Sequence, residues 1–296
     1  MQSFSRRQLA VLVALTLVWG INWPVMKIGV GAMPPLTFRT LSLWLSLPVL
    51  ALAVAWTKVP LRVPRKHWPE LLLLTATNML IWHSLIIVAV KSLSSGRAAI
   101  LGYTMPIFAA VFGAAFLGIR LLPRAWCGVA AAAAGVLLLL WHELSNLAGR
   151  PVAVLMTLAG AATWAAGTHL LKRSRLPVPT LAIAFWMTAL TALFLSLLAV
   201  VFERAQWAPP PRAAWGGIAY NAVLIFGFAH AAWFWLARDL PPVASTLSVM
   251  FIPVVGVFGG ALWLGEVLHW QDWAAVLLLV LAIASVLWPQ RAAPAR

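Results

Sequence analysis

Seven residues inside long apolar runs of this chain carry groups that can hold a small molecule. They are Asn22, Asn78, Trp82, His83, Tyr103, Trp164 and His230. Polar groups at membrane depth are costly, and they are retained mainly where they face protein or a water-filled cavity rather than lipid. Amide, imidazole, phenol and indole groups supply hydrogen bonds and ring stacking. The pattern therefore predicts a substrate-binding site.

Asn22 lies in LVWGINWPVMKIG, at the start of the chain. Its carboxamide either bonds the amino or carboxylate group of a substrate or bonds a neighbouring helix, because interhelical amides are common in membranes. Lys27 falls in the last turn of the same run, so we expect it to extend to the outer interface.

His83 lies with Asn78 and Trp82 in LTATNMLIWHSLIIV, and its counterpart in the second half is His230. Two histidines at equivalent depths would flank one central cavity; the alternative is a buried histidine bonded to a neighbouring helix. A metal site is disfavoured, because no zinc-ligand spacing and no nearby carboxylate accompany them. We therefore expect no metal and no cofactor.

Tyr103 and Trp164 could stack on an apolar or aromatic substrate side chain while keeping a polar tip for a hydrogen bond. The alternative is an interfacial position, since membrane proteins place many tryptophans in belts and this chain has 18. Both residues lie deep in their runs, which leaves substrate contact open.

The elements that must position these residues are membrane helices. Hydrophobic residues make up 63% of the chain, charged residues 9%, and the mean hydropathy is +0.95. A net charge of +15 would suggest nucleic acid in a soluble protein, but here the basic residues lie in short connectors. The composition predicts a multi-pass protein in a lipid bilayer that binds no nucleic acid, and the single Cys127 excludes an internal disulfide.

Apolar runs long enough to cross a bilayer predict ten transmembrane helices. They cover approximately residues 8–29, 35–57, 69–90, 94–118, 124–142, 150–172, 178–202, 214–237, 242–264 and 270–288. The remaining connectors are too short to form a soluble domain.

The chain also repeats itself. A shift of 145 positions pairs WGINWPVMK with WAAGTHLLK, and a shift of 147 pairs His83 with His230 and AAVFGAAFLG with GVFGGALWLG. Five helices in each half would make the second copy enter from the opposite side of the membrane. The predicted fold is all-α, with inverted five-helix repeats at 1–146 and 147–296 around a central cavity. Such repeats are typical of transporters that open one site alternately to either side.

Basic residues orient the predicted helices. Seven of the 21 Lys and Arg residues fall on the side away from the N-terminus: Lys27, Arg39, Lys91, Arg97, Arg150, Arg204 and Arg212. Because the others lie on the N-terminal side, the positive-inside rule places both termini in the cytoplasm.

Small residues and prolines recur in the fourth and ninth helices. Gly113 matches Gly260, each within a small-xxx-small spacing, and Pro106 matches Pro253. The small residues indicate close packing within each half or, alternatively, dimerisation, so monomer and homodimer both remain open. The prolines predict a kink in each helix, either a hinge or a static bend.

The WG-x-N motif (Trp19, Gly20, Asn22), the tandem halves and this proline and glycine pattern resemble the EamA-type drug/metabolite transporter superfamily, and within it most resemble YddG-type amino acid exporters. The resemblance implies a ten-helix exporter of aromatic and other neutral amino acids in the bacterial inner membrane. The second copy departs from the motif, because Gly167 stands where the first has Asn22.

Alternative functions remain open. The chain could export other small metabolites or cationic drugs, or act as a proton-coupled antiporter. A passive channel and a membrane enzyme are different classes, and no Walker-type loop, HExxH or paired carboxylates favour an enzyme. The six acids all fall in connectors or terminal turns: Glu70, Glu143, Glu203, Asp239, Glu266 and Asp272. With only His83, His169 and His230 left to carry protons, we expect facilitative transport.

Overall fold

The computed structural model describes residues 6–118, 123–145, 150–233 and 242–287, and this part of the chain is helical with short connectors. In the first half the elements are α1 (Arg6–Ala32), α2 (Pro35–Thr57), η1 (Arg65–His67), α3 (Trp68–Thr75), η2 (Ala76–Leu80), α4 (Ile81–Ser92), α5 (Ser95–Gly102), α6 (Met105–Leu117) and α7 (Pro123–Ser145). The second half contains α8 (Pro151–Arg173), α9 (Thr180–Glu203), η3 (Arg204–Gln206), α10 (Arg212–Tyr220), η4 (Asn221–Ala229), α12 (Pro242–Leu264) and α13 (Trp270–Leu287).

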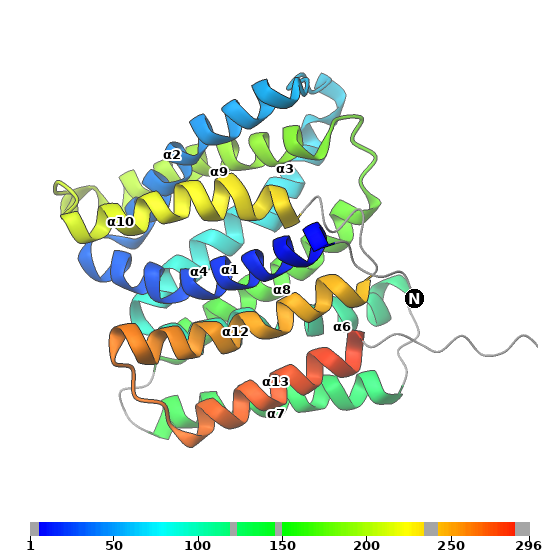
Figure 1. Cartoon of the computed structure of the whole chain (residues 1–296), viewed down its shortest axis with the longest axis vertical. Coiled ribbons are helices and arrows are strands. Elements are labelled where there is room, and N and C mark those ends of the chain that lie inside the picture. The colour runs from blue at the N-terminus through cyan, green and yellow to red at the C-terminus, as the bar shows by residue number, and fades with distance from the viewer. Residues whose placement is uncertain (1–5, 119–122, 146–149, 234–241, 288–296) are drawn as a thin grey trace, which may run out of the picture.

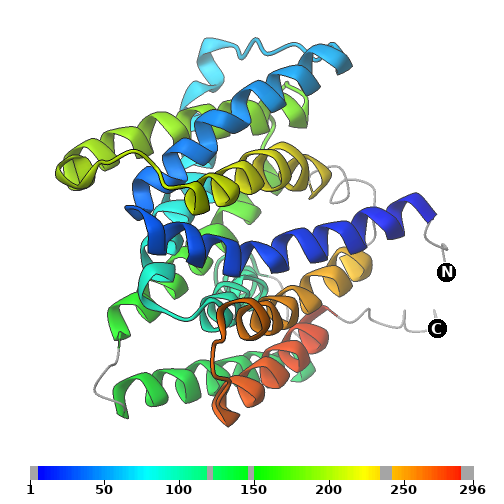
Figure 2. The same cartoon turned by 60° about the vertical axis from the view of Figure 1, so that its left-hand side comes forward.

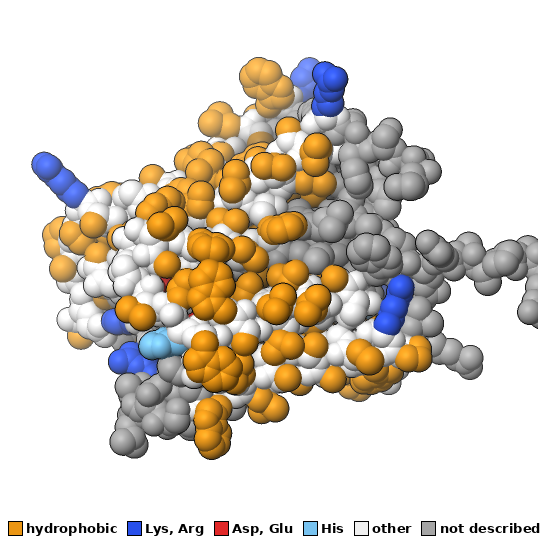
Figure 3. Space-filling model, turned by 60° about the horizontal axis from the view of Figure 1, so that its bottom comes forward, with side chains coloured by type: hydrophobic (Ala, Val, Ile, Leu, Met, Phe, Trp, Pro, Cys, Tyr) orange, Lys and Arg blue, Asp and Glu red, His pale blue; other side chains and the backbone are white. Residues whose placement is uncertain are grey.

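Six helical stretches in the described ranges are long and apolar enough to cross a membrane. They are Gln8–Ala32, Pro35–Thr57, Arg65–Ser92, Ser95–Leu117, Pro151–Arg173 and Thr180–Gln206, and shorter apolar helices cover Pro123–Leu139, Phe251–Leu264 and Trp270–Ser285. Hydrophobic side chains cover the middle of the face drawn in Figure 3, whereas Lys and Arg lie toward its ends. This distribution is that of an all-helical membrane protein.

The helices run roughly side by side, and those of the two halves interleave (Figures 1 and 2). α1 packs on α12, α2 on α9, and α7 on α13, so each of these pairs joins the first half to the second. α8 packs on α4 and α6 of the first half. The start of α1 and the end of α13 lie at the same end of the bundle (Figure 1).

The other end of the bundle, where α2, α5 and α13 begin, carries buried acids, and we call it the acid-capped end. Glu203 accepts hydrogen bonds from the backbone N–H groups of Leu36 (2.9 Å) and Thr37 (2.7 Å) and from the Thr37 hydroxyl (2.7 Å). It thereby satisfies amide groups that a helix start leaves without partners, and it places negative charge at the positive end of the helix dipole.

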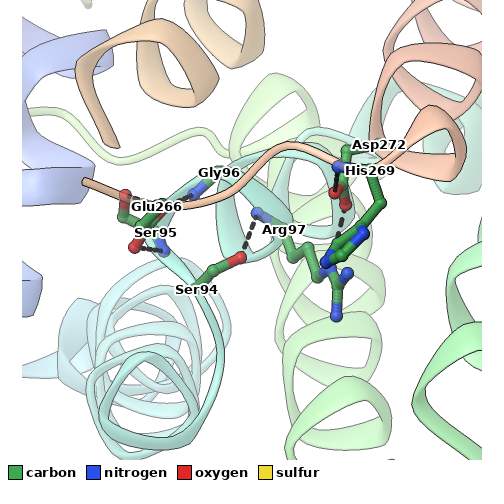
Figure 4. Close-up of polar contacts among 7 residues, drawn as sticks. All are labelled: Ser94, Ser95, Gly96, Arg97, Glu266, His269 and Asp272. Atoms are coloured by element: carbon green, nitrogen blue, oxygen red, sulfur yellow. Dashed lines mark hydrogen bonds and ion pairs between the residues drawn. The ribbon is translucent and has the colours of Figure 1, made fainter. Parts of the chain in front are cut away.

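Glu266 and Asp272 act in the same region (Figure 4). Glu266 accepts from the N–H and hydroxyl groups of Ser95 and from the N–H of Gly96, at the start of α5. Asp272 forms an ion pair with Arg97, with 2.8 Å between Oδ1 and Nε. Together with Glu203, these acids of the second half hold the starts of two first-half helices.

Lys27 lies near the acid-capped end and donates to three backbone carbonyls at the end of α4, those of Val90 (3.0 Å), Lys91 (3.0 Å) and Leu93 (2.6 Å). These carbonyls have no partner within a helix that ends there. The Lys27 ammonium group therefore caps α4. Besides the expected extension toward the interface, the side chain makes this specific contact.

Candidate functional site

The two histidines that the predicted repeat pairs, His83 and His230, lie against each other in the interior. Their ring centroids are 5.9 Å apart, and both side chains are buried. The Phe226 ring stacks on His230 at 5.3 Å and meets His83 edge-on at 5.1 Å. Trp164 lies 6.5 Å from His83 and 6.3 Å from His230. We call His83, Trp164, Phe226 and His230 the ring cluster; it joins α4 and α8 to the end of η4.

Two stretches of π-helix precede the histidines. η2 ends three residues before His83, and η4 ends directly before His230. His230 Nδ1 lies 2.8 Å from the carbonyl oxygen of Ile225, five residues earlier, so this nitrogen donates and carries the proton. π-Helix often occurs at functional sites, because the wider turn redirects side chains. Nothing in the apolar periodicity of the sequence indicated it.

Further aromatic side chains surround the ring cluster. Trp82 meets Trp164 at 5.5 Å, and Trp19 meets His230 at 6.2 Å. Tyr103 instead contacts Trp23, at 6.3 Å. Thus the structure brings Trp82, Trp164 and both histidines together as one group, whereas the ring contact of Tyr103 is with α1.

The two asparagines are buried, but in different surroundings. Asn78 donates to the carbonyl of Leu74 (3.1 Å) and lies against Gly167 of α8, where a methyl group would be only 2.7 Å from its Nδ2. Gly167 is the counterpart of Asn22 in the predicted repeat, and the Asn78 amide covers it. Asn22 Oδ1 has no hydrogen-bond partner among the residues that the structure describes, and the same holds for His83 Nε2.

Arg39 is the main residue that the sequence reasoning misjudged. The sequence pattern places it among the connector cations, but it lies in the second turn of α2 with only 1% of its surface exposed. Its Nη1 donates to Asn221 Oδ1 at 2.9 Å, and its guanidinium lies 5.5 Å from the centre of the Phe226 ring. Its position four residues inside an apolar run was the available signal.

The small residues bring the halves together. A methyl group on Gly256 would collide with Ala99 of α5, and one on Gly260 would collide with Ser95 of α5 and with Glu266. Gly20 of the WG-x-N motif likewise faces Val255 on α12. Gly256 and Gly260 therefore both contact α5 of the first half, and Gly260 also contacts Glu266 of its own half. Gly113 is buried in α6.

The matched prolines differ in their effect. At Pro106 the helix is interrupted, since α5 ends at Gly102 and α6 begins at Met105. Pro253 lies inside α12, which is continuous there. One proline therefore lies at the start of a new helix and the other within a continuous one, and the kink at each stays a prediction.

No carboxylate that the structure describes reaches the ring cluster. Glu203, Glu266 and Asp272 bind groups at the acid-capped end, and Glu70 lies in the first turn of α3. The side chains of Glu143 and Asp239 lie outside the described residues. His169 bonds the carbonyl oxygen of Ala109 at 2.8 Å. Over the described side chains, no group of three His, Cys, Asp or Glu residues could hold a metal ion.

Comparisons with known proteins show which family the chain resembles. The EamA-like transporter family matches the chain twice, over residues 7–141 and 151–288. The "Uncharacterized inner membrane transporter YedA" of Escherichia coli (strain K12) is 28% identical over 276 residues, covering 93% of this chain and 89% of that protein. A "Probable amino-acid metabolite efflux pump" of Salmonella typhimurium (strain LT2) is 25% identical and covers 93% of each chain.

A solved crystal structure has the same fold, with a TM-score of 0.70 at 21% identity over 95% of this chain and 96% of that one. The family match extends over nearly all the described helices, including those that carry the ring cluster. The chain is therefore a multi-pass membrane protein that belongs to the EamA-like transporter family.

Proposed function

We propose that this protein is a secondary transporter that exports amino acids, aromatic and other neutral ones, across the inner membrane by alternating access. The observation that carries the proposal is the ring cluster, in which one histidine from each half meets the other beside Trp164 and Phe226. Planar rings suit an aromatic side chain, and the unpartnered Asn22 Oδ1 and His83 Nε2 suit the polar head group. A relative named as a probable amino-acid metabolite efflux pump supports amino acids as the substrate class.

The proposed mechanism requires ten crossings in two inverted halves, 1–146 and 147–296. The double family match supports this division. So do Gly118 and Gly265, which are 147 positions apart and both have positive φ, of 65° and 63°, where the fourth and ninth predicted helices end. The contacts between helices also support this division. α1 of the first half packs on α12 of the second, and α8 of the second half packs on α6 of the first. In the predicted repeat α8 corresponds to α1 and α12 to the helix that contains α6, so exchanging the halves converts one pair into the other.

The proposed topology places both termini in the cytoplasm. Its support is the common position of the start of α1 and the end of α13 at one end of the bundle (Figure 1), together with the distribution of basic residues. Reporter fusions after Ala148 and after Arg296 are expected to report periplasm and cytoplasm, respectively. A cytoplasmic signal at both sites would contradict the five-plus-five arrangement.

Facilitative transport is the proposed mode of energy coupling. Proton relays use intramembrane acids or histidines; no acid that the structure describes lies beside the ring cluster, and Nδ1 of His230 is already bonded to the Ile225 carbonyl. Substrate entry into liposomes should therefore continue without an imposed pH difference or membrane potential, and internal substrate should accelerate it by exchange. Uphill accumulation driven by a pH gradient, and lost in His83→Gln, would identify a proton-coupled antiporter instead.

The test of the function is a counterflow panel with the purified protein in liposomes, using amino acids, nucleosides and cationic drugs. Saturable counterflow of phenylalanine and of smaller neutral amino acids is the expected result. Counterflow restricted to cationic drugs or other metabolites would show that these compounds, and not amino acids, are the substrates. Flux that does not saturate and shows no exchange would indicate a channel.

A further inference from the structure

Arg39 is a fully buried cation whose contacts are all neutral. Nη1 donates to Asn221 Oδ1 at 2.9 Å, Nη2 lies 2.7 Å from Met26 Sδ, and the Phe226 ring lies below the guanidinium. Nε has no hydrogen-bond partner among the described residues. Glu203 of α9 lies next to the start of α2, but its carboxylate binds two backbone amides and the Thr37 hydroxyl rather than Arg39.

An arginine in these surroundings lacks a counterion. Moving an ion out of water costs several kcal/mol, and neutral hydrogen-bond partners offset only part of that cost. Charged residues within membrane helices usually pair with each other or mark a substrate pathway. No described side chain supplies the opposite charge to Arg39, and a transported anion would supply it.

The guanidinium is also oriented for such a ligand. Asn221 Nδ2 donates to the carbonyl of Gly217 at 3.0 Å, which leaves Asn221 Oδ1 pointing at Arg39. The planar fork of arginine matches the two oxygens of a carboxylate better than an ammonium does. Asn221 is thus a positioning residue, because it acts on the ligand through Arg39.

Arg39 lies one ring away from the histidine pair. The guanidinium lies over Phe226, at 5.5 Å from the ring centre, and Phe226 stacks on His230 at 5.3 Å. A phenylalanine-sized molecule held at the ring cluster could therefore direct its carboxylate toward α2. Arg39 lies in the second turn of α2, which begins at the acid-capped end, so this contact would lie on that side of the ring cluster.

We propose that Arg39 is the carboxylate-binding residue of the transporter, oriented by Asn221, and that it makes the protein select substrates carrying a carboxylate. The inference rests on the proposed amino acid export, which it deepens. It assigns the carboxylate to α2 and leaves the ring cluster to bind the side chain.

The test uses two analogues, each with half of the phenylalanine head group. Phenylalanine counterflow in proteoliposomes is inhibited with 3-phenylpropanoate, which keeps the carboxylate, or with phenethylamine, which keeps the amine. A charge-assisted bidentate contact should make 3-phenylpropanoate the stronger inhibitor of the wild type by about tenfold or more. Arg39→Gln should abolish this preference, and Asn221→Ala should reduce it by a smaller factor.

Arg204→Gln is the matched control, because Arg204 is an exposed cation at the acid-capped end; its inhibitor preference should equal that of the wild type. Arg39→Lys is a second variant at the site and should regain only part of the preference. Correct folding of each variant is checked by gel filtration and thermal melting in detergent.

The outcomes separate the two proposals. If the wild type transports phenylalanine but is inhibited equally by both analogues, the assignment of Arg39 is overturned and the export function stands. A folded Arg39→Gln variant that keeps the wild-type preference also overturns it. If no amino acid shows counterflow with the wild type, the proposed function fails, and this inference fails with it.

Discussion

Glu203 offers a quantitative test of the acid-capped end, because one substitution removes a charge while keeping the size of the side chain. In Glu203→Gln one oxygen remains and can still accept from one backbone amide. The other oxygen becomes an NH₂ group, which cannot accept from a second N–H. The Thr37 hydroxyl can rotate to accept from this NH₂ group, so that contact is conserved.

The expected loss of stability follows from these contacts. One charge-assisted hydrogen bond in a buried position is worth about 1.5–3 kcal/mol. Removing negative charge from the start of α2 costs about 0.3–1 kcal/mol more through the helix dipole. The free energy of unfolding should therefore fall by about 2–4 kcal/mol, summed over these two effects.

Unfolding in mixed micelles of dodecyl maltoside and sodium dodecyl sulfate, followed by tryptophan fluorescence, measures this difference. Glu70→Gln is the control: the Glu70 side chain is 35% exposed, its carboxylate accepts a hydrogen bond from the Arg175 N–H at 3.3 Å, and it lies 3.7 Å from His67 Nδ1. That variant should stay within about 0.5 kcal/mol of the wild type. Equal unfolding midpoints for Glu203→Gln and Glu70→Gln would refute the capping argument.

The remaining predictions concern the site. Gly167→Ala should displace the Asn78 amide and reduce the rate of uptake. Gly216→Ala is the control and should leave the rate unchanged, because a methyl group there meets nothing within 4 Å. Equal uptake rates for the two variants would contradict the packing of Gly167 against Asn78. Trp164→Ala should weaken phenylalanine transport by about fivefold more than alanine transport, because a ring contact contributes about 0.5–1.5 kcal/mol; competition assays would measure this, and an equal loss for both substrates would point to a head-group role. His83→Gln should leave downhill exchange independent of an imposed pH gradient, which a fluorescent pH indicator inside the liposomes would check.

Helix positions were predictable because a membrane span is mainly a matter of length and apolar composition. The predicted run 35–57 has the same bounds as α2, and the run at 178–202 differs by one or two residues from α9. The convergence of His83 and His230 could be anticipated in the same way, since the predicted repeat places them at equal depth.

Contacts between residues far apart in the sequence could not be predicted. Hydropathy gives the approximate depth of a residue but not the face that meets a neighbour, so Arg39 was assigned to a connector although its partner Asn221 lies 182 positions later. The π-helix before each histidine has no apolar signature. Pro106 and Pro253 match in the sequence, yet their neighbours determine whether the helix ends or continues.

The separation between Arg39 and Asn221 has a consequence for biogenesis. At about 5–20 residues per second, the ribosome needs about 10–40 s to synthesise the chain between them. During this interval the guanidinium lacks its amide partner, and four residues separate it from the start of α2, so it can remain hydrated by extending to the lipid head groups. We therefore expect α2 to insert in a shallow position and to reach its final depth only when η4 arrives, so that the second half completes the insertion of the first.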